Sequence, residues 1–138
     1  MISDATKVLI VDDFSLARVM LSESLKVLGI KDLVEAKNGR EALALLEESF
    51  QQNKPFSLVF LDWAMPEMDG YEVLKACRAD EKFSKLPIIM VTAEEDRSSV
   101  LKAIAAGADS YIKKPISSDI LSKKIEEMNQ KFSSRKET

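Results

Sequence analysis

The sequence predicts an α/β protein in which five strands form a doubly wound parallel sheet and five helices cover both of its faces. Short, uninterrupted apolar runs recur along the 138 residues, and such runs are typical of strands that are buried on both sides. Segments with apolar residues at three- and four-residue spacing separate the runs and predict helices. The alternation of strands with helices favours parallel strands joined by right-handed crossovers.

The first half of the chain begins with an apolar run that ends in two adjacent carboxylates, Asp12 and Asp13. Gly29 is a natural cap for the end of the helix that follows. The next strand is short, so we expect it at an edge of the sheet. The elements predicted here are a strand over 7–11, a helix over 15–28, a strand over 33–36 and a helix over 40–49. The residues expected to face the core are Phe14, Ala17, Leu21, Leu25 and Leu28 in the first helix, and Ala42, Leu43, Leu45 and Leu46 in the second.

The second half is organised around a strand that runs from Leu58 into Asp62. Pro66 ends this strand, because proline cannot continue a central strand. Asp69 and Glu72 resemble a capping box at the start of the next helix. The elements predicted here are a strand over 58–62, a helix over 70–79, a strand over 88–91, a helix over 97–106, a strand over 109–113 and a helix from Ser117 or Ser118 to about 132.

Apolar spacing also predicts which helical residues of the second half face the core. The acidic run over 94–96 is expected to form the first turn of its helix, since acidic groups suit a helix N-terminus. Residues 133–138 are expected to be a frayed polar tail. The expected core residues are Val73, Leu74 and Cys77, then Val100, Leu101, Ile104 and Ala105, then Leu121, Ile125, Met128 and Phe132.

Composition excludes several classes of protein. The net charge of −3, with acidic and basic residues interspersed, gives no support for a nucleic-acid surface. No apolar run approaches the roughly 20 residues that span a bilayer, and the N-terminus lacks the pattern of a signal peptide. The single cysteine, Cys77, excludes an internal disulfide. We therefore expect one domain over residues 1–138, with a core of about 6–132, no membrane partner and a cytoplasmic location.

The absence of histidine excludes His-based acid–base catalysis and His metal sites, and the single cysteine excludes a zinc site. The four glycines stand too far apart for a dinucleotide-binding or P-loop motif. Any metal site must therefore use oxygen ligands, which suit Mg²⁺ or Ca²⁺.

Polar residues follow four of the predicted strands: Asp12 and Asp13, Asp62, Thr92, and Lys114. The carboxyl ends of parallel strands share one edge of the sheet, where ligands bind in such folds. Three carboxylates gather there only if a cation neutralises them, and Mg²⁺ is the natural choice. Taken singly, each residue has an ordinary role as a cap, a strand end or a solvated lysine. Their joint placement instead predicts phosphoryl transfer to an aspartate.

At this point the sequence resembles the receiver domain of two-component response regulators, over about residues 6–132. The motifs that carry the resemblance are Asp12-Asp13, Asp62 with Met65-Pro66 and Asp69-Gly70, Thr92-Ala93, and Lys114-Pro115. Trp63 and Tyr111 make the chain most similar to stand-alone chemotaxis members. The resemblance implies a flavodoxin-like fold with strand order 2-1-3-4-5.

The resemblance also implies a role for each site residue. Asp62 would accept a phosphoryl group from a phosphohistidine on a histidine kinase or phosphotransfer protein, which fits a chain without histidine. Lys114 and Thr92 would contact the phosphoryl oxygens, and Tyr111 would move inward after transfer. The implied Mg²⁺ ligands are Asp12, Asp13, Asp62 and the backbone carbonyl of Ala64. Backbone amides of Trp63 and Ala93 are expected to help bind the phosphoryl group.

The leading interpretation is therefore a switch rather than an enzyme, with self-catalysed phosphotransfer and autodephosphorylation. Its output to a protein target is expected through the helix over 97–106, the strand over 109–113 and the last helix. Residues offered by that face are Lys102, Tyr111, Lys113 and Lys123. Two alternatives stay open: a phosphate sink in a phosphorelay, and, less favoured because Ala64 replaces an acid, an aspartyl-phosphate phosphatase.

Overall fold

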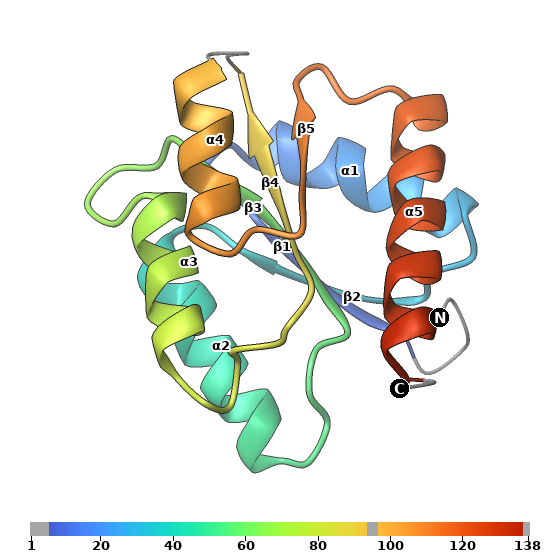
Figure 1. Cartoon of the computed structure of the whole chain (residues 1–138). Helices are drawn as coiled ribbons and strands as arrows, with labels where there is room; N and C mark the ends of the chain where they lie inside the picture. The colour runs from blue at the N-terminus through green and yellow to red at the C-terminus, as the bar shows by residue number, and fades with distance from the viewer. Residues whose placement is uncertain (1–5, 94–96, 137–138) are drawn as a thin grey trace.

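The computed structural model describes residues 6–93 and 97–136 and shows a parallel sheet between two layers of helices (Figure 1). The strand order is β2-β1-β3-β4-β5, and every adjacent pair is parallel. The predicted fold class and strand order are confirmed. The strands are β1 (Lys7–Val11), β2 (Asp32–Ala36), β3 (Leu58–Asp62), β4 (Ile88–Thr92) and β5 (Ser110–Lys113). The helices are α1 (Ser15–Val27), α2 (Gly39–Gln51), α3 (Gly70–Ala79), α4 (Arg97–Ala105) and α5 (Ser118–Lys136).

The sheet buries one apolar cluster on each face. Alternate residues of a strand point to opposite faces, so β3 directs Phe60 to one cluster and Leu61 to the other. α1 and α5 cover the cluster around Phe60, whereas α2, α3 and α4 cover the cluster around Leu61 (Figure 1). β3 is buried along its whole length, which explains its uninterrupted apolar sequence.

An ion-pair network holds the two helical layers together beside β5. The Asp109 carboxylate, only 7% exposed, accepts a hydrogen bond from Arg78 of α3 at 3.1 Å. It also pairs with Lys131 of α5 at 3.1 Å and accepts a hydrogen bond from the backbone N–H of Ile88. Arg78 donates further hydrogen bonds to the carbonyls of Gly107 and Phe83. Asp109 is therefore bound from both helical layers at once.

Four predictions of helix packing were wrong. Phe14 is 61% exposed, because it lies just before α1 rather than on its buried side. Leu101 and Ile104 of α4 are 62% and 47% exposed, and Ala105 is also exposed. Ala103, in contrast, is 1% exposed. The small Ala103 packs on the core, so the buried side of α4 is rotated from the side that apolar spacing predicts.

The polar tail was predicted to be frayed, and this was wrong over 133–136, where α5 continues to Lys136. No glycine or proline interrupts this stretch, so nothing in it ends a helix. The acidic run over 94–96 lies outside the described residues, as does the side chain of Phe132. Within the described ranges, no helix is both long and apolar enough to cross a bilayer.

Candidate functional site

The structure gathers the predicted acidic residues at the carboxyl edge of the sheet. Asp12 follows β1, and Asp62 is the last residue of β3. Asp12, Asp13 and Asp62 each place a carboxylate oxygen within 4.8 Å of the others. The Lys114 ammonium, directly after β5, lies 2.7 Å from Asp12 Oδ2 and 3.6 Å from Asp62 Oδ2.

The two adjacent aspartates have different environments. Asp12 is 6% exposed, and its Oδ1 accepts a hydrogen bond from the backbone N–H of Phe14 at 2.9 Å. Its backbone carbonyl accepts a hydrogen bond from Arg18 at 2.7 Å, and Arg18 also pairs with Glu35. Asp13 is exposed. The structure therefore fixes Asp12 in the pocket wall and leaves Asp13 open to solvent.

Burial and like charges change the acidity of Asp62. The side chain is 5% exposed, and burial is the main reason why the pKa of Asp62 rises to about 6. Asp12 and Asp13 raise the pKa further, while Lys114 opposes this effect. Burial alone would lower the pKa of Lys114, but its interactions with Asp12 and Asp62 outweigh burial and raise it. A cation at this position would relieve the repulsion between the carboxylates.

The loop between β3 and α3 is tightly built around Asp62. The N–H of Gly70 donates to the carbonyl of Trp63 at 2.9 Å. A Cβ atom on Gly70 would collide with the backbone carbonyl of Asp62, so only glycine fits there. The Asp69 carboxylate caps α3 by accepting from the N–H of Glu72 at 2.9 Å, as the sequence predicts. Gly70 and Asp69 thus hold the end of β3 close to the start of α3.

The remaining predicted site residues lie around this edge and differ in how far they are exposed to solvent. Ala64 and Ala93 are exposed, and Thr92 is partly exposed at the end of β4. Tyr111 is partly buried in β5, with Lys124 Nζ 5.2 Å from its ring centroid. The N–H of Trp63 donates to the carbonyl of Val91 at 2.9 Å. This hydrogen bond occupies the Trp63 amide here, and its use in phosphate binding stays a prediction.

Sequence reasoning missed an apolar groove that opens beside the acidic cluster. The groove has a volume of about 600 Å³, and Asp12 and Lys114 contribute to its lining. Leu16 and Met20 of α1 are 55% and 61% exposed there. The available signal was a second set of apolar residues in α1 outside the core stripe. The apolar lining comes mainly from Phe14, Leu16, Val19, Met20, Pro115 and Ile116.

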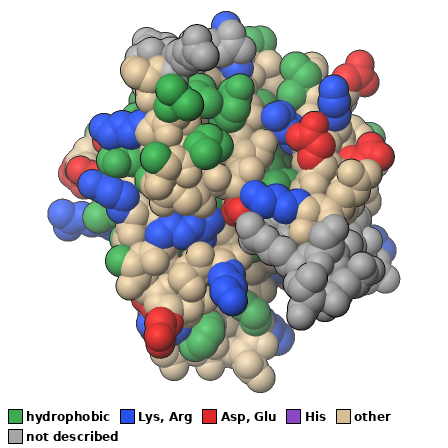
Figure 2. Space-filling view, viewed as in Figure 1, with side chains coloured by type: hydrophobic (Ala, Val, Ile, Leu, Met, Phe, Trp, Pro, Cys, Tyr) green, Lys and Arg blue, Asp and Glu red, His purple; other side chains and the backbone are tan. Residues whose placement is uncertain are grey.

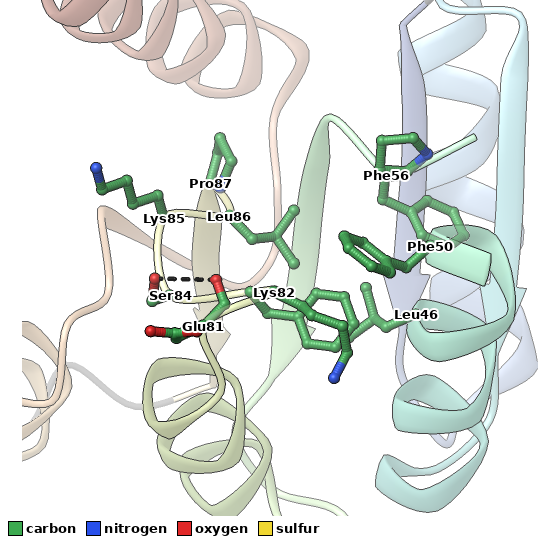
Figure 3. A pocket seen from close by; sticks show the side chains of 11 residues that line it. Leu46, Phe50, Phe56, Glu81, Lys82, Ser84, Lys85, Leu86 and Pro87 are labelled. Carbon is green, nitrogen blue, oxygen red and sulfur yellow. Dashed lines mark hydrogen bonds between the residues drawn. The ribbon is translucent and has the colours of Figure 1, made fainter. Parts of the chain in front are cut away.

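A second hollow lies at the opposite end of the strands (Figure 3). It measures about 560 Å³, and Phe56 and Pro87 in its wall precede β3 and β4. Figure 3 shows the side chains of Phe50, Phe56 and Leu86 lining it. Of the described residues, the cluster of three carboxylates belongs to the other edge, so this hollow is separate from the candidate site.

Comparison with known proteins identifies relatives over most of the chain. The chain is 40% identical over 122 residues to the chemotaxis protein CheY of Pseudomonas aeruginosa, covering 88% of this chain and 94% of that protein. It is also 40% identical over 122 residues to a CheY homolog of Campylobacter jejuni, covering 88% and 91%.

Solved structures agree with this relationship. Chemotaxis protein CheY4 of Vibrio cholerae matches with a TM-score of 0.77 and 34% identity, covering 88% of this chain and 97% of that one. The receiver domain of the histidine kinase CKI1 from Arabidopsis thaliana, solved in complex with Mg²⁺ and BeF₃⁻, matches with a TM-score of 0.73 and 30% identity, covering 86% and 88%. The family model of the response regulator receiver domain matches residues 8–126. The chain therefore belongs to the response regulator receiver domain family of two-component signalling.

Proposed function

We propose that this receiver domain is a phosphorylation-dependent switch in which Asp62 accepts a phosphoryl group from a phosphohistidine of a histidine kinase or phosphotransfer protein. The observation that carries the proposal is the convergence of Asp12, Asp13 and Lys114 on Asp62 at the carboxyl edge of the sheet. A carboxylate there is a nucleophile placed among groups that bind charged oxygens. The relationship to chemotaxis proteins favours chemotaxis as the process.

In the proposed reaction, an oxygen of Asp62 attacks phosphorus, and the phosphorus–nitrogen bond to the donor imidazole breaks. The leaving nitrogen keeps the electron pair of that bond, and the product is an acyl phosphate. Lys114 lies 3.6 Å from Asp62 Oδ2, within reach of a phosphoryl oxygen attached there. Thr92, at the end of the neighbouring strand, would donate its hydroxyl to a second oxygen, and Tyr111 would move inward as the switch changes state.

The acidic cluster fits Mg²⁺. Its donors are all oxygens, and the three carboxylates lie close enough to share one ion. The residues that would hold Mg²⁺ are Asp12, Asp13, Asp62 and the carbonyl of Ala64. Bound Mg²⁺ supplies charge neutralisation between the acceptor carboxylate and the phosphoryl oxygens. Asp12 already contacts Lys114 at 2.7 Å, so its remaining oxygen lone pairs are the ones available for a metal.

The α1 groove supports a protein rather than a small molecule as the donor. Exposed Leu16 and Met20 form an apolar surface beside Asp12 and Lys114. Contiguous apolar surface of this kind marks protein contacts. A helix of the donor protein that lies in this groove would present its phosphohistidine over Asp62.

The output surface would be formed by α4, β5 and α5. Apolar side chains gather over α4, where Leu101 and Ile104 are exposed (Figure 2). Lys102, Lys113 and Lys123 supply positive charge on the same elements. The target protein would bind one of two conformations of this face more tightly than the other.

We further propose that residues 1–138 act as one cytoplasmic domain.

Intact-mass measurement after incubation with Mg²⁺ and acetyl phosphate tests the proposal. The wild type should gain the mass of one phosphoryl group, and Asp62→Asn should gain none. Asp32→Asn is the matched control, because Asp32 is an exposed aspartate at the far end of β2. This control should be modified like the wild type. No adduct on the wild type, or an adduct that persists in Asp62→Asn, would contradict the proposal.

A further inference from the structure

Two aromatic rings stack beside the acceptor. The ring centroids of Trp63 and Tyr71 are 5.4 Å apart, and their planes differ by 18°. Trp63 follows Asp62 directly and packs against the apolar cluster under α2, α3 and α4. The backbone of Trp63 is held on both sides, by Val91 of β4 and by Gly70 of α3. Trp63 therefore provides a side-chain contact between the end of β3 and α3, in addition to the close backbone approach of Gly70 to Asp62.

Two lysines approach the same tyrosine ring from different helices. Lys102 of α4 places its ammonium 4.4 Å from the Tyr71 centroid, and Lys75 of α3 places its ammonium 4.6 Å away. An ammonium is attracted to the electron-rich face of such a ring. Lys75 and Tyr71 both belong to α3, so the contact between them connects no second helix. The Lys102 contact joins α4 to α3, and through Trp63 to the acceptor strand.

We propose that the contact from Lys102 through Tyr71 to Trp63 couples the position of α4 to the state of Asp62. Tyr71 and Lys102 are then positioning residues of the switch, and this inference rests on the function proposed above. The contact forms with Asp62 as an unmodified carboxylate, and the coupling requires that it stabilise this form more than the phosphorylated one. A movement of α4 that separates Lys102 from Tyr71 loses this stabilisation.

The position of Lys102 gives the coupling a direction. Its neighbour Leu101 is 62% exposed on the same helix, so a target bound to α4 acts on the helix that carries the contact. Coupling between two sites is reciprocal. A target that draws Lys102 away from Tyr71 therefore favours the phosphorylated form of Asp62, and phosphorylation favours binding of that target.

Beryllofluoride binding in the presence of Mg²⁺ tests the coupling, with a signal that comes from the ligand and not from Trp63. ¹⁹F NMR of bound beryllofluoride gives the dissociation constant for the wild type, Lys102→Met, Lys102→Arg and Lys75→Met. Loss of the cation–π contact should make Lys102→Met bind about two- to fivefold more tightly. Loss of a positive charge by itself would weaken the binding of an anion, so this gain has the opposite sign to a charge effect. Lys102→Arg keeps a cation over the ring and should bind like the wild type.

Lys75→Met is the matched control, because it removes a lysine from the same ring without touching α4. It should not bind more tightly than the wild type. The coupling is overturned if Lys75→Met gains as much affinity for beryllofluoride as Lys102→Met, or if Lys102→Met gains none. In either case, binding of beryllofluoride by the wild type leaves the proposed function intact. If the wild type fails to bind beryllofluoride, the proposed function fails, and the coupling fails with it.

Discussion

Asp62 combines burial with negative neighbours, and both make its charged form costly. The pKa of Asp62 is raised from 3.8 to about 6, chiefly by burial and next by Asp12. Under the proposed function, Asp62 must nevertheless be ionised to act as a nucleophile. The fold therefore keeps the Asp62 carboxylate in a place where its charge destabilises the native state.

This cost predicts a pH dependence of stability without metal. Between pH 3.8 and about 6 the native state binds more protons at Asp62 than the unfolded state does. The contribution of Asp62 to the free energy of unfolding therefore falls as the pH rises through this window. Above pH 6 the loss should be roughly 2 to 3 kcal/mol. Asp62→Asn should remove it, so in EDTA the variant should be more stable than the wild type at pH 7.

Urea unfolding of both proteins at pH 4 and pH 7 provides the measurement. The stability difference between them should grow with pH, and Asp32→Asn should show no such growth because Asp32 is exposed. An equal difference at both pH values would mean that Asp62 titrates normally. That result would remove the electrostatic argument for the acidic pocket.

At the scale of the element, the turn from β3 into α3 is the most constrained part of the site. Gly70 begins α3 directly under the Asp62 carbonyl, and a Cβ atom there would also lie 2.9 Å from the Asp62 carbonyl carbon and 3.0 Å from Trp63 Cα. These are backbone atoms, so no side-chain rotation relieves the contact.

Gly70→Ala should therefore lower the free energy of unfolding by more than about 2 kcal/mol and displace Asp62. Gly29→Ala is a useful comparison, because Gly29 has a φ of +95° but no atom within 4 Å of an added Cβ. That variant should lose only about 1 kcal/mol, from backbone strain. Thermal unfolding gives both values. Equal losses would mean that conformation, and not crowding at Asp62, governs Gly70.

The elements themselves were largely predictable from sequence. The buried apolar runs fixed the strands, and the Asp69 cap marked the start of α3 within the described chain. Apolar spacing failed in α4, because the small Ala103 packs more closely on the core than Leu101 can. Apolar spacing does not distinguish a residue that packs in the core from one that is exposed for a partner. The exposed apolar residues of α1 show the same limitation.

Contacts across the sheet edge were predictable only in part. Strand ends placed Asp12, Asp62 and Lys114 together, as their order in a parallel sheet requires. Lys114 Nζ lies closer to Asp12 Oδ2, at 2.7 Å, than to Asp62 Oδ2, at 3.6 Å. This difference depends on how the side chains are placed, which a sequence pattern does not predict. The approach of Lys102 to Tyr71 depends on the rotation of α4, which the sequence pattern predicted wrongly.

At the scale of the whole molecule, the acidic cluster links metal binding to folding. Only the native state brings Asp12, Asp13 and Asp62 together, so Mg²⁺ should stabilise it. At a concentration 100 times the dissociation constant, the gain should be about 2.7 kcal/mol. Differential scanning calorimetry with and without Mg²⁺ should show a higher Tm with the metal.

Asp13→Asn separates this effect from general salt effects. Removing one of three clustered charges should raise the Tm without metal, because less repulsion remains. The same variant should lose most of the Mg²⁺-dependent rise. A sharp fall in its metal-free Tm would instead mean that Asp13 stabilises the fold directly.

The arrangement of the core also has a consequence for biosynthesis. β1 is the first strand of this domain in chain order, yet its Ile10 faces a cluster completed by Leu121, Ile125 and Met128 of α5. Within the domain, the first strand in chain order is therefore covered by the last helix. A nascent chain shows this apolar face to its surroundings until α5 has emerged, and surfaces of this kind are prone to aggregate. The domain can therefore close only after α5 has emerged.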